Sequence, residues 1–404
     1  MNNSKILGGI LLVSGTAIGA GMLALPIHTA MSGFIPSAIA FVISWFFMTL
    51  AALLLLEVNL WLPGEKDLLS MISATMGKGA KAISWILYLL LLYSLIAAYL
   101  EGSSAWLIKL HLSQTKVTLS RVLSISIIIL LFGGIASMGT AITEKCNRWL
   151  AFGLIIAYFI LIASSLTSIV PAQLERREWT QTFSIFSLLI TAFGFSVVLP
   201  SLTNYLDRNV RSLKKVIILG SIIPLVIYLF WELVSLGIIP LEGEIGFRKL
   251  AENDNGTGVA LALEHIVGNH WISQSSQWFS IFAILTSLLG VSLALFHFLA
   301  DALRLNPKKG FNRLTLFILT YLPPFCVVLF YPSGFGRILS FAGIIVAVLL
   351  GIIPAIMVWR GRYHQNIPHP GFRLFGGKVM IILIIFFFSC VAMLEVKNWI
   401  VFLI

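Results

Sequence analysis

The sequence predicts an all-helical (all-α) membrane protein with about eleven transmembrane helices, and three observations support this fold class. The composition is 59% hydrophobic and only 11% charged, with a mean hydropathy of +0.99. Long apolar runs recur along the 404-residue chain, separated by short polar or charged stretches. Two of these runs are interrupted by glycine and small polar residues. A soluble domain of this size does not have such a composition, so we expect the chain to lie in a lipid bilayer.

The apolar runs define the predicted transmembrane helices. About 20 apolar residues cross the ~30 Å of hydrocarbon in a bilayer, and the fourth and ninth runs are short. The approximate limits of the first six are Ile6 to Ala30, Ile35 to Leu62, Ala82 to Ile108, Leu119 to Ser137, Trp149 to Val170 and Phe183 to Leu202. Those of the other five are Val216 to Ile239, Trp278 to Leu303, Leu314 to Tyr331, Ile338 to Trp359 and Val379 to Phe402. They predict one transmembrane domain over residues 1–404. The longest outer loop contains a short amphipathic helix between Gly256 and Gly268, which either covers the outer mouth or is an ordinary surface helix.

Lysine and arginine residues are distributed unevenly between the predicted loops. With the N-terminus in the cytoplasm, the cytoplasmic loops carry about twice as many of them as the loops on the other side. Eleven spans then place the C-terminus on the periplasmic side. The net charge of +11 fits basic loops beside anionic lipid, and no nucleic-acid partner is expected. The cysteines Cys146, Cys326 and Cys390 lie far apart in the sequence, so no metal site or cofactor is expected.

The first apolar run is interrupted near its middle. The stretch Ser14-Gly15-Thr16-Ala17-Ile18-Gly19-Ala20-Gly21 contains three glycines, each of which weakens a helix by ~1 kcal/mol relative to alanine. Unwound backbone at membrane depth occurs only where it is buried in protein or lines a cavity. This run is therefore either a discontinuous helix at a binding site or a small-residue face for close helix packing.

A second interruption lies in the sixth run and favours the binding-site interpretation. The stretch Thr191-Ala192-Phe193-Gly194-Phe195-Ser196 is followed by Leu199-Pro200, as Leu25-Pro26 follows the first interruption. The two interruptions are five spans apart. This spacing predicts two inverted repeats of five helices, over about 6–170 and 183–359, with an extra helix over about 379–402.

Broken helices offer a specific chemistry. Free amide groups begin the second half of such a helix and free carbonyl groups end the first half. The amide end suits a carboxylate, and the carbonyl end suits an ammonium group or a small cation. No ionisable residue lies at either interruption, so main-chain groups would hold the two charges of an amino acid. The candidate binding residues are Thr16, Ala17, Gly19, Ala20, Gly21, Met22, Thr191 and Gly194.

The stretch from Gly15 to Pro26 resembles the first-helix signature of the bacterial tyrosine- and tryptophan-specific permeases, which form the hydroxy and aromatic amino acid permease family. Other similar stretches are Leu53-Leu54-Leu55-Leu56-Glu57-Val58, Ala97-Ala98-Tyr99, Phe193-Gly194-Phe195, Gly220-Ser221-Ile222-Ile223-Pro224, Thr286-Ser287-Leu288-Leu289-Gly290 and Leu322-Pro323-Pro324. The resemblance is closest to the tyrosine-specific members. It implies a LeuT-type fold, eleven helices, the bacterial inner membrane, and proton-driven uptake of tyrosine. Aromatic side chains would then line the site, and the candidates are Tyr93, Tyr99, Phe193 and Phe195.

Ionisable residues inside the spans are candidates for ion coupling, because burying a charge in a membrane is costly. Glu101 is one, with an outer-interface pair to Lys109 as the alternative. Glu57 is another, with a loop-paired carboxylate as the alternative, and Glu232 is either a proton carrier or a packing partner.

The eighth span offers two further ion-coupling candidates. His297 and Asp301 share one helix face. The alternative to ion coupling is a plain ion pair with Arg304 at the inner end of the span. Thr286 and Ser287 lie in mid-span, and the resembling fold uses hydroxyl groups of this helix for a cation site. Sodium coupling therefore stays open beside proton coupling, unless these hydroxyl groups bond only to their own helix.

Three positions depart from the family pattern. Ser196 follows Phe193-Gly194-Phe195 where family members carry His, and His297 stands where they tend to carry Asp. Glu101 occupies a position where a small polar residue is expected. These departures bear on proton coupling and on substrate choice.

Other function classes lack their sequence signatures. The chain contains no His-Glu-x-x-His, Gly-x-Ser-x-Gly or nucleotide-binding Gly-x-x-x-x-Gly-Lys motif, so an enzyme or an ATP-driven pump is not expected. A channel would need repeated pore loops or rings of charge, which are also missing. A transporter remains, either an aromatic amino acid symporter or a sodium-coupled or broader neutral amino acid carrier.

Overall fold

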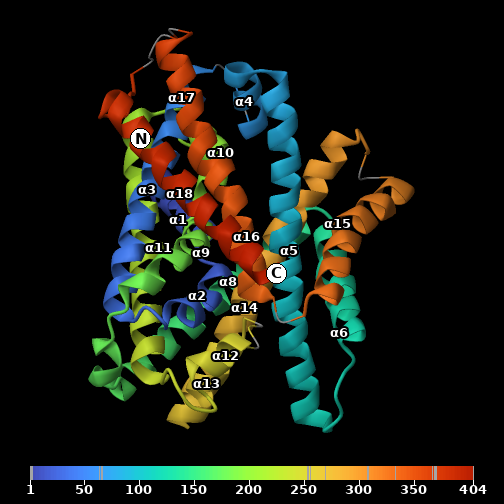
Figure 1. Cartoon of the computed structure of the whole chain (residues 1–404). Coiled ribbons are helices and arrows are strands. Elements are labelled where there is room, and N and C mark those ends of the chain that lie inside the picture. Colours follow the sequence, from blue (N-terminus) through green and yellow to red (C-terminus); the bar gives the residue numbers. More distant parts are fainter. Residues whose placement is uncertain are drawn as a thin grey trace.

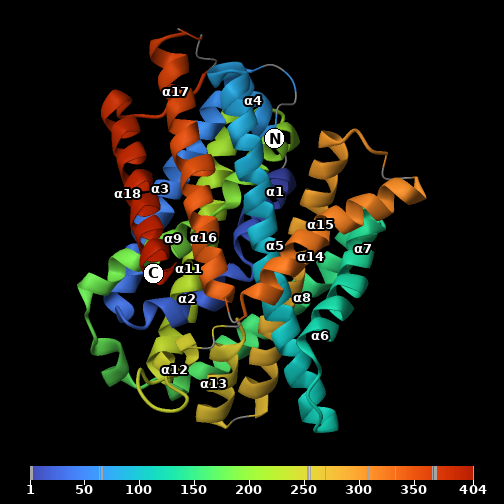
Figure 2. The ribbon, with the colours of Figure 1, turned by 45° about the vertical axis from the view of Figure 1, so that its right-hand side comes forward.

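The computed structural model is almost wholly helical in the residues that it describes, which are 3–62, 64, 67–252, 254, 256–268, 270–306, 309–332, 334–365, 367 and 371–403 (Figures 1 and 2). Within these residues the only strand-like pairing is a single bridge between Asp254 and Gly334. The predicted helical class is therefore confirmed.

Nine helices of the described residues are long and apolar enough to cross a membrane, and a bent pair makes a tenth. The bent pair is α1 (Asn3–Ala17) and α2 (Gly21–Thr29), which meet at 53°. Seven crossings are single helices: α3 (Phe34–Trp61), α5 (Lys78–Thr115), α8 (Thr140–Ser165), α11 (Val210–Ile238), α14 (His270–Ala302), α15 (Gly310–Phe330) and α18 (Gly377–Leu403).

The other two long crossings are built from short helical segments. One contains η4 (Trp179–Ile185), α9 (Phe186–Ala192), η5 (Phe195–Val198) and α10 (Leu199–Tyr205); the other contains α16 (Phe335–Val346), η6 (Ala347–Ile352) and α17 (Ile353–Tyr363). The predicted fourth span corresponds to α6 (Arg121–Ile128), η1 (Ile129–Gly133) and α7 (Gly134–Ser137). This run is shorter than a normal crossing of ~20 residues.

Capping side chains and a glycine define where some of the helices begin. Asp67 accepts a hydrogen bond from the Ser70 amide at the start of α4 (Leu68–Met76), and Asn209 does the same for Ser212 at the start of α11. Gly77 has a φ of +94° between α4 and α5, a conformation that favours glycine. The chain can therefore reverse direction between these two helices.

The helices form two groups. In one, α11 packs against α1, α2 and α3, and α3 also packs against α9 and α10. In the other, α14 packs against α5, α8 and α15. In Figure 1, α3 and α11 of the first group lie on the left of the view, and α5 and α15 of the second lie on the right. Because α2 contacts both α9 and α16, the two interrupted helices meet in the interior.

The two ends of the molecule carry different connections. Helices α12 (Phe247–Glu252) and α13 (Gly258–Val267) lie at the end opposite α4 and α17 (Figure 1). The short helix predicted between Gly256 and Gly268 is confirmed as α13. It packs against α14, α11 and α2, so it covers the end of the first broken helix.

A buried ion pair joins α3 to α17. Arg362 Nε donates to Glu57 Oε1 over 2.7 Å, Nη2 donates to Oε2, and the Leu374 amide also donates to Oε2. The Glu57 side chain is 0% exposed and that of Arg362 is 1% exposed. Breaking such a pair by removing one partner costs about 3–5 kcal/mol, because a lone charge stays buried. Glu57 is therefore a structural anchor of this end of the molecule.

Candidate functional site

The first predicted interruption is present as a break between α1 and α2. The helix ends at Ala17, and the Ala20 amide donates to Ser287 Oγ on α14 over 2.9 Å. A Cβ atom at Gly19 would collide with the same hydroxyl oxygen. A larger residue here would displace that hydroxyl from its bond with the Ala20 amide, so glycine fits the close approach of α14. Among the described residues the amides of Gly19 and Gly21 have no acceptor.

The second predicted interruption lies between α9 and η5. The Gly194 amide donates to the Thr191 carbonyl, and the Phe195 amide donates to the Phe193 carbonyl over 2.9 Å. A tight local turn thus replaces regular helix at these residues. The two breaks are neighbours, since a Cβ atom at Gly21 would lie 3.7 Å from the Ala192 Cα.

Tyr228 on α11 connects the two breaks. Its hydroxyl oxygen lies 2.6 Å from the Ala17 carbonyl oxygen and 3.1 Å from that of Ala192. These carbonyls end the first halves of the two broken helices, where no helical amide can satisfy them. The single hydroxyl proton serves one of them at a time. Nothing in the sequence singled out Tyr228, because it lies in an ordinary apolar span.

Aromatic side chains fill the space beside the breaks. The Phe193 ring centre lies 5.2 Å from that of Tyr228 and 6.5 Å from that of Phe41, and all three side chains are fully buried. Phe195 and Met22 are also fully buried. Buried aromatic side chains therefore pack beside the two breaks.

The structure brings some predicted site residues together and directs others away. Tyr99 interacts with Ser287 and so belongs to the first break. The Tyr93 hydroxyl donates to the Leu319 carbonyl on α15, which packs on α5 and α14. Thr16 is exposed and bonds to its own helix, and Thr191 donates to the carbonyls of Ser187 or Leu339. Tyr93 is therefore not part of the cluster around the breaks.

Glu101 is paired, but not with the predicted partner. Arg121 Nη2 lies 2.5 Å from Glu101 Oε2 and also donates to the Val328 carbonyl. Lys109, which the sequence suggested as partner, lies 3.5 Å from Glu264 on α13. The prediction of a Glu101–Lys109 pair is wrong, because the chain folds α6 back along α5 and brings Arg121 to the carboxylate.

The eighth-span candidates differ from one another. Ser287 accepts from the Ala20 amide, whereas Thr286 donates to the Ala283 carbonyl of its own helix. His297 and Asp301 are exposed, and in the described part of the chain neither forms an ion pair. The pair of Asp301 with Arg304 that the sequence offered as an alternative is absent from these residues. The departure residue Ser196 is buried, and its hydroxyl has no partner among the described residues.

A second carboxylate lies beside α2, the second half of the first broken helix. Thr29 Oγ1 at the end of α2 is 2.7 Å from Glu232 Oε2 on α11. Glu232 is 1% exposed, and its Oε1 has no hydrogen-bond partner within the described residues. One residue earlier, the Trp231 ring nitrogen donates to the Met22 carbonyl. Helix α11 therefore contacts the first broken helix on both sides of its break.

The end of α2 also contacts Asp254, which lies between α12 and α13. His28 Nε2 lies 3.1 Å from Asp254 Oδ2, and that oxygen accepts a hydrogen bond from the Gly336 amide at the start of α16. A Cβ atom at Gly336 would collide with both side chains. These contacts join α2, the loop before α13, and α16.

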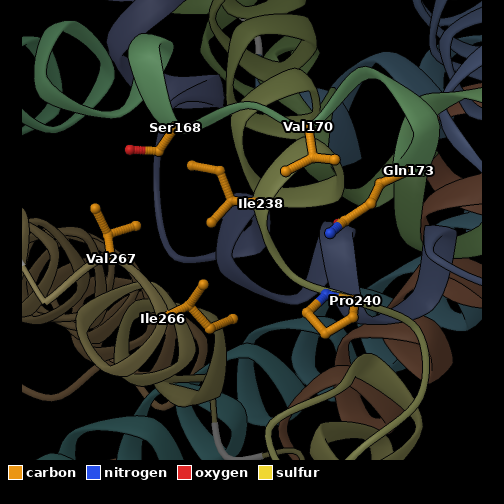
Figure 3. A pocket seen from close by; sticks show the side chains of 7 residues that line it. All are labelled: Ser168, Val170, Gln173, Ile238, Pro240, Ile266 and Val267. Atoms are coloured by element: carbon orange, nitrogen blue, oxygen red, sulfur yellow. The ribbon is translucent and has the colours of Figure 1, made fainter.

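A pocket of about 430 Å³ lies away from the breaks (Figure 3). Its lining comes from η2 (Leu166–Ser168), η3 (Pro171–Glu175), the end of α11 and the end of α13. The lining residues are Ser168, Val170, Gln173, Ile238, Pro240, Ile266 and Val267. Because none of them belongs to either broken helix, we do not assign the pocket to the site at the breaks.

Comparison with known proteins gives a consistent result over nearly the whole chain. Residues 2–395 match the tryptophan/tyrosine permease family. The tyrosine-specific transport system 1 of Haemophilus influenzae is 32% identical, over 95% of this chain and 94% of that protein. The tryptophan-specific transport protein of the same organism is 31% identical, over 95% and 93%. The glutamine transporter 2 of Aliivibrio fischeri is 29% identical, over 90% and 93%.

Proposed function

The chain belongs to the tryptophan/tyrosine permease family, and from this premise we propose that it is a secondary active symporter that imports an aromatic amino acid, mainly tyrosine, together with protons. The family consists of transport permeases rather than enzymes, and the chain is a multi-pass membrane protein. The similarity to bacterial permeases supports a place in the bacterial inner membrane. The distribution of Lys and Arg supports a cytoplasmic N-terminus, and a periplasmic C-terminus follows if the short run from Arg121 to Ser137 is counted as an eleventh crossing.

The observation that carries this proposal is the meeting of the two broken helices. The amides of Gly19 and Gly21 offer positive helix-end charge to a carboxylate. The carbonyls of Ala17 and Ala192, which share the hydroxyl of Tyr228, offer negative charge to an ammonium group. An α-amino acid carries both groups a few ångströms apart, so it complements the two helix ends without any charged side chain.

The aromatic rings beside the breaks support an aromatic substrate. Phe193, Phe41 and Tyr228 form one contact cluster. A substrate ring that enters this cluster would replace ring–ring contacts with equivalent ones. The preference for tyrosine rests on the similarity to a tyrosine-specific transport system.

Alternating access would move one helix group against the other. In a LeuT-type arrangement the broken helices, with α3 and α11, rock against α5, α8, α14 and α15 around the central site. The grouping of helix contacts supports this division. The contacts of Ser287 with Ala20 and of Asp254 with His28 cross between moving parts, so they would form and break during the cycle.

A sodium-coupled or broader neutral amino acid carrier is the second candidate. The similarity to a glutamine transporter favours the broader substrate range. Sodium coupling would use the hydroxyl of Ser287 and the carbonyls at the first break. In the present arrangement that hydroxyl accepts from the Ala20 amide.

Uptake into proteoliposomes tests the proposal. Radiolabelled tyrosine is supplied with an imposed inward pH gradient or an imposed inward sodium gradient, and unlabelled amino acids compete. We expect accumulation under the pH gradient, with inhibition by tyrosine, phenylalanine and tryptophan. Accumulation that requires sodium would support the second candidate for coupling, and competition by glutamine would support the broader range. Folded protein that transports no amino acid under either gradient would overturn both.

A further inference from the structure

Glu232 is a buried carboxylate that the amino acid site does not use. It lies on α11, 1% exposed, and touches the end of α2 through Thr29. Its Oε1 atom has no hydrogen-bond partner among the described residues. A carboxylate in such a place carries a large desolvation cost unless it binds a proton or a cation.

No described side chain supplies that cation. The charged groups on the elements packed against α11 are either engaged elsewhere or exposed. Those engaged are Lys5 with Asp207, His28 with Asp254, Glu57 with Arg362, Glu264 with Lys109, and Arg176 with the Met31 carbonyl. Those exposed are Glu144, Lys145 and Arg148 on α8, Glu175 on η3, and His265 on α13. Tyr158 on α8 donates to Ile227, Tyr228 to the break carbonyls, and the basic residues of α11 itself, Arg211, Lys214 and Lys215, lie in its first two turns.

The hydroxyl of Thr29 gives the carboxylate two alternative bonding patterns. It lies 2.7 Å from Glu232 Oε2 and 2.9 Å from the Leu25 carbonyl, but it has one proton to donate. A protonated Glu232 donates to Thr29, whose own proton then serves Leu25, so each of the three groups is bonded. An ionised Glu232 accepts a hydrogen bond from the Thr29 hydroxyl, which then cannot donate to the Leu25 carbonyl. The proton on Glu232 therefore decides a hydrogen bond within α2.

We propose that Glu232 binds the co-transported proton and that Thr29 transmits its presence to the outer half of the first broken helix. This inference rests on the proton-coupled symport proposed above. A proton from the outer solution forms an O–H bond at the Glu232 carboxylate, and the same bond breaks when the proton leaves to the cytoplasm. The amino acid itself is unchanged.

One face of α11 links this site to the amino acid site. Tyr228 bonds to Ala17 at the end of α1, Trp231 bonds to Met22 near the start of α2, and Glu232 bonds to Thr29 at the end of α2. All three contacts are to the helix whose amides would hold the substrate carboxylate. A change at Glu232 therefore acts on the element that binds substrate, without direct contact to the substrate.

The test is Glu232→Gln, measured in two transport modes of the reconstituted protein. Counterflow exchanges external labelled tyrosine for internal tyrosine and needs no proton movement. Accumulation under an inward pH gradient needs coupled protons. We expect E232Q to retain counterflow and to lose accumulation above the external concentration. Glu395→Gln is the matched control, since Glu395 is a buried carboxylate on α18 that lies near His28 but bonds to Asn398 and makes no bond to Thr29, and it should keep both modes.

The outcomes separate this inference from the proposed function. Wild-type protein that accumulates tyrosine under the pH gradient, together with E232Q that does so equally well, would overturn the role of Glu232 and leave the symporter intact. Wild-type protein without any tyrosine transport would overturn the proposed function itself. Accumulation driven by sodium alone would overturn the proton assignment. If E232Q lost counterflow as well, Glu232→Asp decides: proton-driven accumulation with a shifted pH dependence supports the inference, and counterflow without accumulation overturns it.

Discussion

The two broken helices are interrupted in similar sequence contexts but are held in different ways. The first break depends on contacts from distant helices, which are Ser287 on α14 and the Tyr228 and Trp231 side chains on α11. The second break shares the Tyr228 hydroxyl through Ala192, but its turn is local, since Gly194 and Phe195 bond to residues two or three positions earlier. The first break is therefore a tertiary feature and the second mainly a local one. Substitutions at the first should disturb the protein more.

The largest effect is expected for Gly19→Ala. The new methyl group collides with the Ser287 hydroxyl, and overpacking of this kind costs about 1–3 kcal/mol. Since 1.4 kcal/mol is a factor of ten, a cost of this size at the substrate-binding break should lower tyrosine uptake by about five- to 150-fold. Uptake by proteoliposomes measures this. The double variant G19A/S287A removes the colliding oxygen and should recover part of the uptake. Normal uptake by G19A would show that the first break does not depend on this close approach.

Tyr228→Phe comes next, because it removes a bond that both breaks share. The two buried carbonyls of Ala17 and Ala192 would lose their hydroxyl donor, at a cost of about 1–3 kcal/mol, while the ring contacts with Phe193 and Phe41 stay. We expect a lower melting temperature in detergent and weaker tyrosine binding. Tyr158→Phe is the comparison, as its hydroxyl bonds to a single carbonyl on α11, that of Ile227, and to neither break. Equal effects of both variants on binding would contradict a special role for Tyr228.

Gly194→Ala should have a smaller effect than Gly19→Ala. Gly194 has a φ of −71°, which any residue adopts, and its Cβ would lie 3.1 Å from the Thr191 carbonyl oxygen. A shift of a few tenths of an ångström relieves this contact, so the cost should stay within ~1 kcal/mol. The same uptake assay, run beside G19A, measures the difference. A loss as large as that of G19A would remove the distinction between the two breaks.

The smallest effect is expected for Thr16→Ala. The side chain is exposed and its hydroxyl bonds only to the Leu12 carbonyl of its own helix. Stability should change by no more than ~0.5 kcal/mol, as for most surface substitutions. Tyrosine uptake and melting temperature should both match wild type. A marked loss of uptake with unchanged stability would place Thr16 in contact with substrate at another stage of transport.

The sequence predicted those features that depend on neighbouring residues of the chain. Both interruptions were predicted because glycine and proline act on their own helix, and α13 was predicted from its apolar pattern between two glycines. Helix class and most spans follow in the same way from apolar length.

Contacts between distant residues could not be predicted in this way. The Glu101 partner is Arg121 rather than the nearer Lys109, and the acceptor for Ala20 is 267 residues away in the chain. Tyr228 has no local signature, because its role comes from the elements that fold against α11. Glu232 could be singled out as an ionisable residue in a span, but its contact with Thr29 could not be predicted. The fourth span was predicted as a crossing, yet its helix is short and contains the π-helical segment η1.

The ion pair between Glu57 and Arg362 has a consequence for the synthesis of the protein. Its two residues are 305 positions apart, so Glu57 emerges from the ribosome long before its partner exists. At ~5–20 residues per second the delay is about 15–60 s. Throughout this time Glu57 on α3 has no Arg362 guanidinium to bind. Its charge then has to be accommodated by water at the membrane edge, by a bound proton, or by a chaperone. Completion of α17 is therefore the step that allows α3 to reach its buried position. A nascent chain that stops before Arg362 cannot form this ion pair.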